Sequence, residues 1–589
     1  MNISTLKRVA LATTVAAFIG NSANALTYTA IASGNFSSST TWSGGNTPPN
    51  TLIGDIVIIP SGITVTLDQN QQLNGTLSNI TVNGTLASST TSRNALVLTA
   101  GSLAGNGMVD VDSMVLGLTA GFGFTGTINA DRFTSMGSHV SSNASIVINS
   151  ALELRNSDLD LGSGNLSLTS GATIVVSGGT MSTSGGMLSL TNDYNVIYRS
   201  NSANSGVELT GAGLNDVEIN VPSSSSVTLN GDLTIDGTLT LTSGTLNTNN
   251  NDLFFIGNAD FSNSGSGTIS AGSNTSITIT SANNFGGGLR FSSTGNTIND
   301  LNINMSNSSS RAMLASDLTL NGDLNLQAGR MDIGSNDLTV NGNLNGGSSN
   351  SYIITGNDGQ LILSLGAGGS NTYYIGTDNN YAPAIVAGNN GSATGMVGVG
   401  VNTSVFAEGT ANNGADLGSD QPLVDATWHV TSTATANIDL NLETMWSSDM
   451  EVNGFDRTML YLSHYTSGNW DVNATASATT EANGMFSTKR NNITSLSPFA
   501  VMGQNANTTD VKNVLANNAT ITVYPNPAVN SISVNGNYNN AKIYDLNGKM
   551  IKASSMSNNS IIVSELPAGV YTILLNGDNG SATSRFVKQ

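Results

Sequence analysis

Short alternations of apolar and polar residues dominate the middle of this chain, from residue 91 to residue 350. Runs such as Leu233-Thr-Ile235 and Thr238-Leu-Thr-Leu-Thr242 alternate with a period of two, and glycine or asparagine follows them within a few residues. Such alternation places the apolar side chains on one side of a strand and the polar side chains on the other. The pattern predicts many short strands separated by tight bends.

Strands this short suit an all-β coil that winds around an apolar axis, a β-solenoid of the right-handed β-helix type. The alternative is a string of β-sandwiches, whose strands are usually longer and richer in aromatic residues. An internal repeat favours the solenoid, because residues 229–253 align without a gap on residues 314–338 with eleven identities in 25 positions. We therefore predict two repeats, about 211–295 and 296–350, with Leu239 and Leu324 at equivalent inward positions.

The residues before this region, 26–90, have a different pattern. Trp42 is followed by Pro48 and Pro49, and a Gly54-Asp55 pair precedes the apolar run at 56–59. This series resembles the start of G8-type domains. The resemblance implies a glycine-punctuated β head on a surface or extracellular protein, without an assigned active site.

Aromatic residues return after residue 350 and indicate a further domain. Runs such as Trp428-His-Val430 and Asn437-Ile-Asp-Leu-Asn-Leu442 are typical of core strands of a globular β-sandwich over residues 351–503. The stretch Ser467-Gly-Asn-Trp470 indicates a turn into another strand. The polar stretch at 504–519 has no aromatic residue, and we interpret it as a linker that is exposed for processing.

The last seventy residues, 520–589, contain several short strand-like runs. These lie at 531–534, 541–544, 549–551, 561–563 and 570–575, and turn residues such as Asn547-Gly548 separate them. So many strands in so short a segment predict a small antiparallel β-sandwich.

Four blocks of this segment contain, in order, Tyr524, Pro525, Asn526 and Pro527, then Asp545, Gly548 and Lys549, then Leu566, Pro567, Gly569 and Tyr571, and finally Lys588. These blocks resemble the type A C-terminal sorting domain of the type IX secretion system of Bacteroidetes. The resemblance implies that the type IX machinery of the outer membrane is a partner, that the chain crosses that membrane, and that the domain is then removed. The mature protein would be attached to the cell surface or released.

The first 25 residues have the three parts of a Sec-type signal peptide. Lys7 and Arg8 form the positive end, residues 9–19 are apolar, and Ala23 and Ala25 supply the small residues that a signal peptidase requires. The mature chain is expected to begin at Leu26. Elsewhere no stretch approaches the roughly 20 apolar residues of a transmembrane helix, so no transmembrane segment is predicted.

Composition narrows the classes of partner. Charged residues make up only 10% of the chain, and the net charge is −20, which argues against nucleic acid or an anionic membrane as the ligand. The chain contains no cysteine, which excludes disulfides and thiolate chemistry.

Candidate chemistry is sparse. The three histidines are scattered, so neither a metal cluster nor a Ser-His-Asp arrangement is indicated. Asp110 with Asp112, and Asp158 with Asp160, each place two acids on one face of a strand, which suits calcium or acid-base work on a polysaccharide. The solvated outer face of a solenoid produces the same spacing, and we prefer that interpretation. No cofactor is predicted, with calcium left open.

Together these features predict a secreted or surface-attached protein that binds or adheres to a carbohydrate or another surface ligand and catalyses nothing. The alternative is an extracellular polysaccharide-degrading enzyme on a β-helix scaffold. That alternative requires a cleft lined by several acidic and basic residues, and the few Arg and Lys residues count against a lyase.

Overall fold

The structure is a computed structural model that describes residues 25–89, 94–137, 140–183, 185, 187–262, 265–356, 358–393, 395–410, 414–434, 436–504, 521–536, 538–546, 549–577 and 580–589. Its regular structure is nearly all β, and no α-helix occurs in these residues. The expected signal peptide, apart from Ala25, lies outside the described residues. The expected linker lies outside them as well, apart from its first residue, so both stay predictions.

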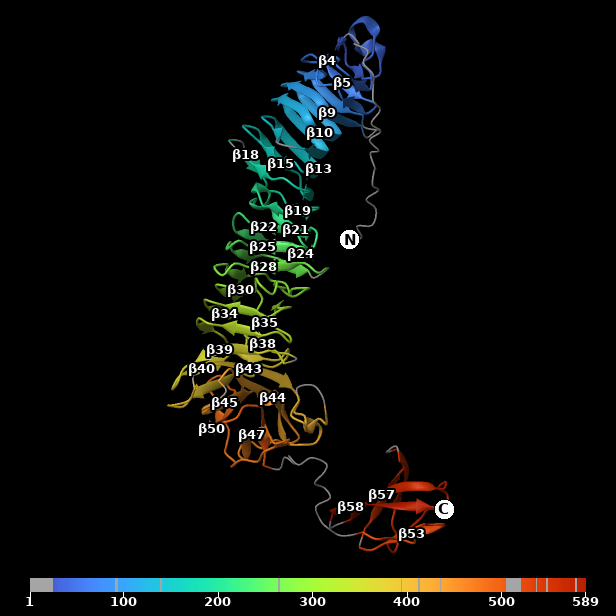
Figure 1. Cartoon of the computed structure of the whole chain (residues 1–589), viewed down its shortest axis with the longest axis vertical. Coiled ribbons are helices and arrows are strands. Elements are labelled where there is room, and N and C mark those ends of the chain that lie inside the picture. The colour runs from blue at the N-terminus through green and yellow to red at the C-terminus, as the bar shows by residue number, and fades with distance from the viewer. Residues whose placement is uncertain are drawn as a thin grey trace. The chain divides into compact units, whose positions relative to one another are not determined.

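Residues 25–383 and 395–400 belong to one compact unit. Its strands pair in parallel with strands one coil further along the chain. Thus β1 (Thr27–Thr29) pairs with β4 (Ile56–Ile59), which pairs with β7 (Asn79–Val82). About 14 turns stack in this way, and Figure 1 shows them following one another in chain order. The β-solenoid that the alternation predicted is confirmed.

The first coils belong to the same stack. β7 pairs with β9 (Ala95–Gly105), and β9 pairs with β10 (Met108–Phe124), so parallel pairing runs across residue 90, where the sequence suggested the end of a head. Trp42 is buried in the first coil. Its ring packs edge-on against Phe36 at 5.1 Å, and its Nε1 donates a hydrogen bond to the Phe36 carbonyl at 2.9 Å.

The later coils have three sides, each formed by a parallel sheet. We name these the amide sheet, the second sheet and the third sheet. The amide sheet contains β23 (Leu233–Ile235), β26 (Leu253–Phe255), β29 (Ile277–Ile279), β31 (Leu301–Asn304), β34 (Leu324–Ala328) and β37 (Leu344–Gly346). The second sheet contains β30 (Thr297–Ile298), β33 (Leu318–Leu320), β36 (Leu338–Val340) and β39 (Leu361–Leu365). The third sheet contains β32 (Arg311–Met313), β35 (Arg330–Asp332), β38 (Ile353–Ile354) and β41 (Ile375–Gly376).

The sequence repeat and the coils do not coincide. Leu239 and Leu324 are both fully buried, as the alternation predicted. However, Leu239 pairs with Val217 and Phe261, whereas Leu324 belongs to the ladder that begins at Leu233. The two leucines are therefore inward but lie on different sheets. Four coils separate Leu233 from Leu324. These four coils contain more residues than the 85 by which the two sequence repeats are offset.

Residues 384–393 and 401–504 form antiparallel sheets, as expected for a sandwich. One contains β42 (Ala384–Gly388), β45 (Leu440–Trp446), β50 (Phe486–Ile493) and β49 (Thr479–Thr480). The other contains β46 (Glu451–Val452), β44 (Leu423–Ser432), β51 (Pro498–Gly503), β47 (Leu460–Thr466) and β48 (Asn469–Trp470). Arg490 on β50 joins the two, because its guanidinium binds Asp471 at 2.7 Å and the Leu462 carbonyl at 3.2 Å.

The described residues from 521 to 589 form the small antiparallel sandwich that the sequence predicted. One sheet contains β52 (Val523–Tyr524), β53 (Ser531–Val534) and β56 (Ser560–Ile562), and the other contains β55 (Met550–Ser555), β54 (Asn540–Tyr544), β57 (Gly569–Gly577) and β58 (Gly580–Lys588). A common core that includes Ile532, Ile543, Ile573 and Phe586 lies between them. Gly548 lies outside the described residues.

Candidate functional site

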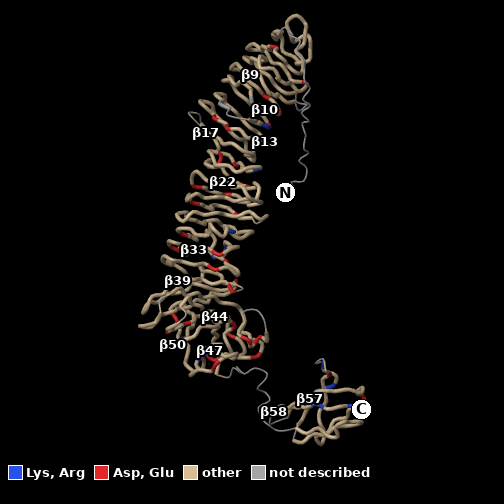
Figure 2. Tube along the Cα trace, viewed as in Figure 1, with Lys and Arg blue, Asp and Glu red and all other residues tan. Residues whose placement is uncertain are grey.

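Aspartates at the bends of the solenoid bind the backbone of a neighbouring coil. Beside the amide sheet, Asp232 Oδ1 accepts the Asp252 N–H at 2.9 Å, and Asp252 Oδ1 accepts the Ser276 N–H at 2.7 Å. Asp323 Oδ1 accepts the Asn343 N–H at 2.8 Å, and this bond lowers the pKa of Asp323 below its usual value. Figure 2 shows acidic residues spread along the coils. These carboxylates therefore hold coils together.

The first predicted acidic pair, Asp110 and Asp112, lies on the outward side of β10. Asp110 Oδ1 accepts a hydrogen bond from Asn129 Nδ2 at 2.9 Å. Asp112 Oδ2 is buried and has no hydrogen-bond partner among the described residues. Asp110 is thus tied to the polar face of the solenoid through Asn129, whereas no such bond is shown for Asp112 Oδ2 in the described part of the chain.

The second pair flanks Leu159 at the short strand β14 (Leu159–Asp160). Asp158 Oδ1 accepts hydrogen bonds from the N–H of Thr180, at 2.9 Å, and from its hydroxyl, at 3.2 Å. Asp160 Oδ1 accepts the Gly162 N–H at 3.0 Å. In the part of the chain that the structure describes, no three His, Asp or Glu side chains are grouped where they could hold a metal ion. Calcium binding stays a prediction.

The described histidines are in the sandwich, and His139 lies outside the described residues. The His464 ring stacks on Phe499 with centroids 4.4 Å apart. Burial, and then the nearby Arg490 charge, lower the pKa of His464 below its ordinary value, which favours the neutral ring. This environment is that of a packed core histidine.

Sequence reasoning did not single out Glu208, a carboxyl group in the solenoid core. It lies in a short 3₁₀ helix, η3 (Val207–Leu209), and is fully buried. Its Oε1 accepts the Tyr198 O–H at 2.5 Å and the Gly206 N–H at 2.7 Å. Burial raises the pKa of Glu208. Nothing in the local sequence signals this, because the bend that turns Glu208 inward depends on neighbouring coils.

The outer face of the amide sheet carries a ladder of side-chain hydrogen bonds. Asn302 Nδ2 donates to Thr278 Oγ1 at 3.2 Å, Asn325 Nδ2 donates to Asn302 Oδ1 at 2.7 Å, and Asn345 Nδ2 donates to Asn325 Oδ1 at 2.9 Å. The ladder arises because these residues are paired in register on successive strands. Each is outward in its own alternating run, so the polar positions of four coils form one column.

A cavity of about 220 Å³ lies over this ladder. None of the residues that line it is charged, and most carry an amide or a hydroxyl group that can donate as well as accept hydrogen bonds. The lining residues are Thr278, Thr280, Asn302, Ile303, Asn304, Asn325 and Gln327. The lining therefore offers hydrogen-bond donors and acceptors without a charged group.

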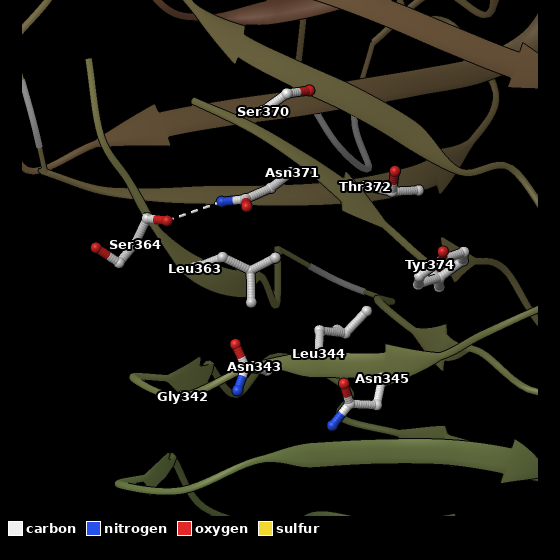
Figure 3. A pocket seen from close by; sticks show the side chains of 10 residues that line it. All are labelled: Gly342, Asn343, Leu344, Asn345, Leu363, Ser364, Ser370, Asn371, Thr372 and Tyr374. Carbon is white, nitrogen blue, oxygen red and sulfur yellow. Dashed lines mark hydrogen bonds between the residues drawn. The ribbon is translucent and has the colours of Figure 1, made fainter. Parts of the chain in front are cut away.

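A second, larger groove of about 450 Å³ lies at the end of the amide sheet (Figure 3). Residues 342–345, in and just before β37, form one side, and Leu363 and Ser364 of β39 lie across it. Ser370, Asn371 and Thr372 of β40 (Ser370–Tyr373), followed by Tyr374, complete it. Asn371 Nδ2 donates to the Ser364 carbonyl at 2.8 Å. No lining residue is charged.

The blocks of the predicted sorting motif meet in the C-terminal domain. Asn526 Oδ1 accepts the Val587 N–H at 2.8 Å, which ties the first block to the last strand. Tyr571 stacks on Phe586, and its hydroxyl donates to the Pro567 carbonyl at 3.0 Å. Asp545 Oδ1 accepts the Lys549 N–H at 3.0 Å.

The remaining motif residues differ in exposure. Leu566 and Lys588 are buried, whereas Tyr524 is 52% exposed. Several motif residues therefore build the fold of this domain.

Comparisons with known proteins give one match. No curated protein and no solved structure matches the chain. The resemblance of the first coils to G8-type domains therefore stays a prediction. None of the helices in the described residues has the length and apolar character needed to cross a membrane. Residues 522–589 match the family described as the secretion system C-terminal sorting domain, which supports the type IX sorting domain and indicates a secreted or cell-surface protein.

Proposed function

We propose that this exported protein is a binding or adhesion protein, and that the outer face of its amide sheet holds a neutral carbohydrate without chemically altering it. The observation that carries the proposal is the ladder from Thr278 to Asn345, which presents amide groups coil after coil. Amides donate to and accept from sugar hydroxyls equally well. A regular column of weak contacts gains affinity through repetition, which suits attachment to a polymer.

The character of the carboxylates supports a non-catalytic role. Hydrolysis of a glycoside uses two carboxyl groups on either side of the scissile bond. The aspartates beside the amide sheet are instead engaged by backbone N–H groups of neighbouring coils, and the cavity on the ladder has no carboxylate in its lining. The alternative, a polysaccharide-degrading enzyme, has no comparable observation in its favour.

A glycan array probed with the mature secreted protein tests the proposal. Asn325→Leu removes the central amide of the ladder and is expected to weaken binding to neutral glycans at least about tenfold. Asn129→Leu is the matched control. Asn129 is also in the middle of a ladder, between Asp110 and Asn149, but it lies on a different sheet. Equal losses from the two variants, or none, would contradict the assignment of the site.

A reducing-sugar assay on the same glycans tests the absence of catalysis. The expected result is no release of reducing ends by the wild-type protein. Turnover that is abolished by Asp110→Asn or Asp158→Asn would favour the enzyme.

A further inference from the structure

The amide sheet ends one strand earlier than the two other sheets of the solenoid. In the coil that contains β36, β37 and β38, each sheet receives one strand. In the next coil, β39 pairs with β36 and β41 pairs with β38. The chain between them forms β40, which is assigned to a different sheet from β37. The groove of Figure 3, between β37 and β40, therefore occupies the place of a missing strand.

The backbone of β37 faces this groove with its unused groups. The Asn343 carbonyl accepts the Leu324 N–H at 2.9 Å, and the Gly347 N–H donates to the Leu326 carbonyl at 2.9 Å. In a parallel ladder, alternate residues bond to the same neighbour. Residues 343, 345 and 347 thus bond to β34, and the N–H and carbonyl groups of Leu344 and Gly346 point to the opposite side, where Leu344 lines the groove. Among the described residues, no strand pairs with this edge of β37.

The lining of the groove indicates what could complete the sheet. The accessible lining is mostly polar and includes Asn345, Asn371 and Thr372, whereas Leu344 and the buried Leu363 contribute little apolar surface. None of the ten lining residues carries a charge, and the nearby carboxylate of Asp323, which accepts a hydrogen bond from Asn345 at 3.2 Å, disfavours an acidic ligand.

We propose that this groove binds an extended, uncharged polypeptide strand, which adds to the free edge of β37 and continues the amide sheet. Backbone hydrogen bonds supply the affinity in this mode of binding, and alternate side chains supply the specificity. One side chain of the added strand packs beside Leu344, and polar neighbours face Asn345 and Asn371. Asn345 belongs to both proposed sites, because it ends the carbohydrate ladder and also lines this groove. The two proposals differ in the groups they use, since the added strand bonds to the backbone edge of β37 and the carbohydrate bonds to side chains on the outer face of the sheet.

The probe is a fluorescent peptide with the sequence of residues 338–343, an uncharged segment whose first three residues form β36 in this chain. Fluorescence anisotropy with the full-length chain is expected to give saturable binding. A peptide N-methylated at alternate residues loses backbone donors and is expected to lose binding, whereas a peptide N-methylated only at its last residue retains it. Absence of saturable binding, or equal binding of both methylated peptides, would refute the proposal.

Two variants of one residue locate the site. Leu344→Pro removes the N–H that faces the groove, whereas Leu344→Ala keeps this N–H and also shortens the side chain. We expect Leu344→Pro to bind the peptide about tenfold more weakly than Leu344→Ala does. If the two bind alike, β37 is not the edge that is used. If a neutral oligosaccharide displaces the peptide and binds Leu344→Pro as well as wild type, the groove is a sugar site and the proposal fails.

Discussion

Substituting Leu239 and its neighbour Thr240 by asparagine tests the central architectural claim, that alternate residues of each short strand point into a common core. Leu239 is fully buried between Val217 and Phe261 of the adjacent coils, whereas Thr240 is outward and pairs with Glu218 and Ser262. Asparagine is a matched substituent, because the same side chain is introduced at both positions. It is also common on the outer face of this solenoid.

The expected magnitudes differ strongly. Shortening a buried leucine costs about 2–5 kcal/mol through lost transfer energy and the remaining cavity. Burying an amide without partners adds about 1–3 kcal/mol. Leu239→Asn should therefore lower the free energy of local unfolding by at least about 3 kcal/mol. Thr240→Asn keeps a polar group in water and should change the free energy of local unfolding by about 0.5 kcal/mol or less.

Hydrogen-deuterium exchange of the peptide that covers β24 (Thr238–Ser243) measures this free energy without requiring the whole chain to unfold in one step. Leu239→Asn should accelerate exchange there and in the coils on either side, because each coil buries its neighbour. Similar exchange rates in the two variants would refute the inward and outward assignment.

Three further outcomes are expected. Deleting residues 522–589 should leave the protein in the periplasm, as cell fractionation with an antibody would reveal, and the normal amount in the medium would argue against a sorting role for this segment. The folded pKa of Glu208 is raised, so its contribution to stability is largest at low pH and decreases as the pH rises above about 4.5 toward the folded pKa. Denaturant unfolding at several pH values should therefore show that Glu208→Gln reduces the decrease in unfolding free energy with pH by up to about 1.4 kcal/mol per pH unit. An unchanged pH dependence would contradict a raised pKa for Glu208. Chelation of calcium should weaken attachment of cells to a glycan surface without altering the circular dichroism spectrum, whereas unchanged attachment would count against a calcium bridge.

The sequence by itself determined which residues face inward, because the period of two is a property of a single strand and requires no knowledge of its neighbours. The solenoid and the strands of the C-terminal sandwich could be predicted for this reason, whereas the sorting motif was identified through its resemblance to a known family. The motif blocks also carry their own turn and core residues, such as Asn526 and Tyr571, within one short segment.

Only the tertiary structure decided which coils lie beside each other. Leu239 and Leu324 are equivalent in the sequence repeat but lie on different sheets, because coils differ in length and the offsets accumulate. The amide ladder from Thr278 to Asn345 and the open edge of β37 depend on this register between coils. Which residues about twenty positions apart come into contact depends on the number of residues in each bend. The local alternation of apolar and polar residues does not reveal that number.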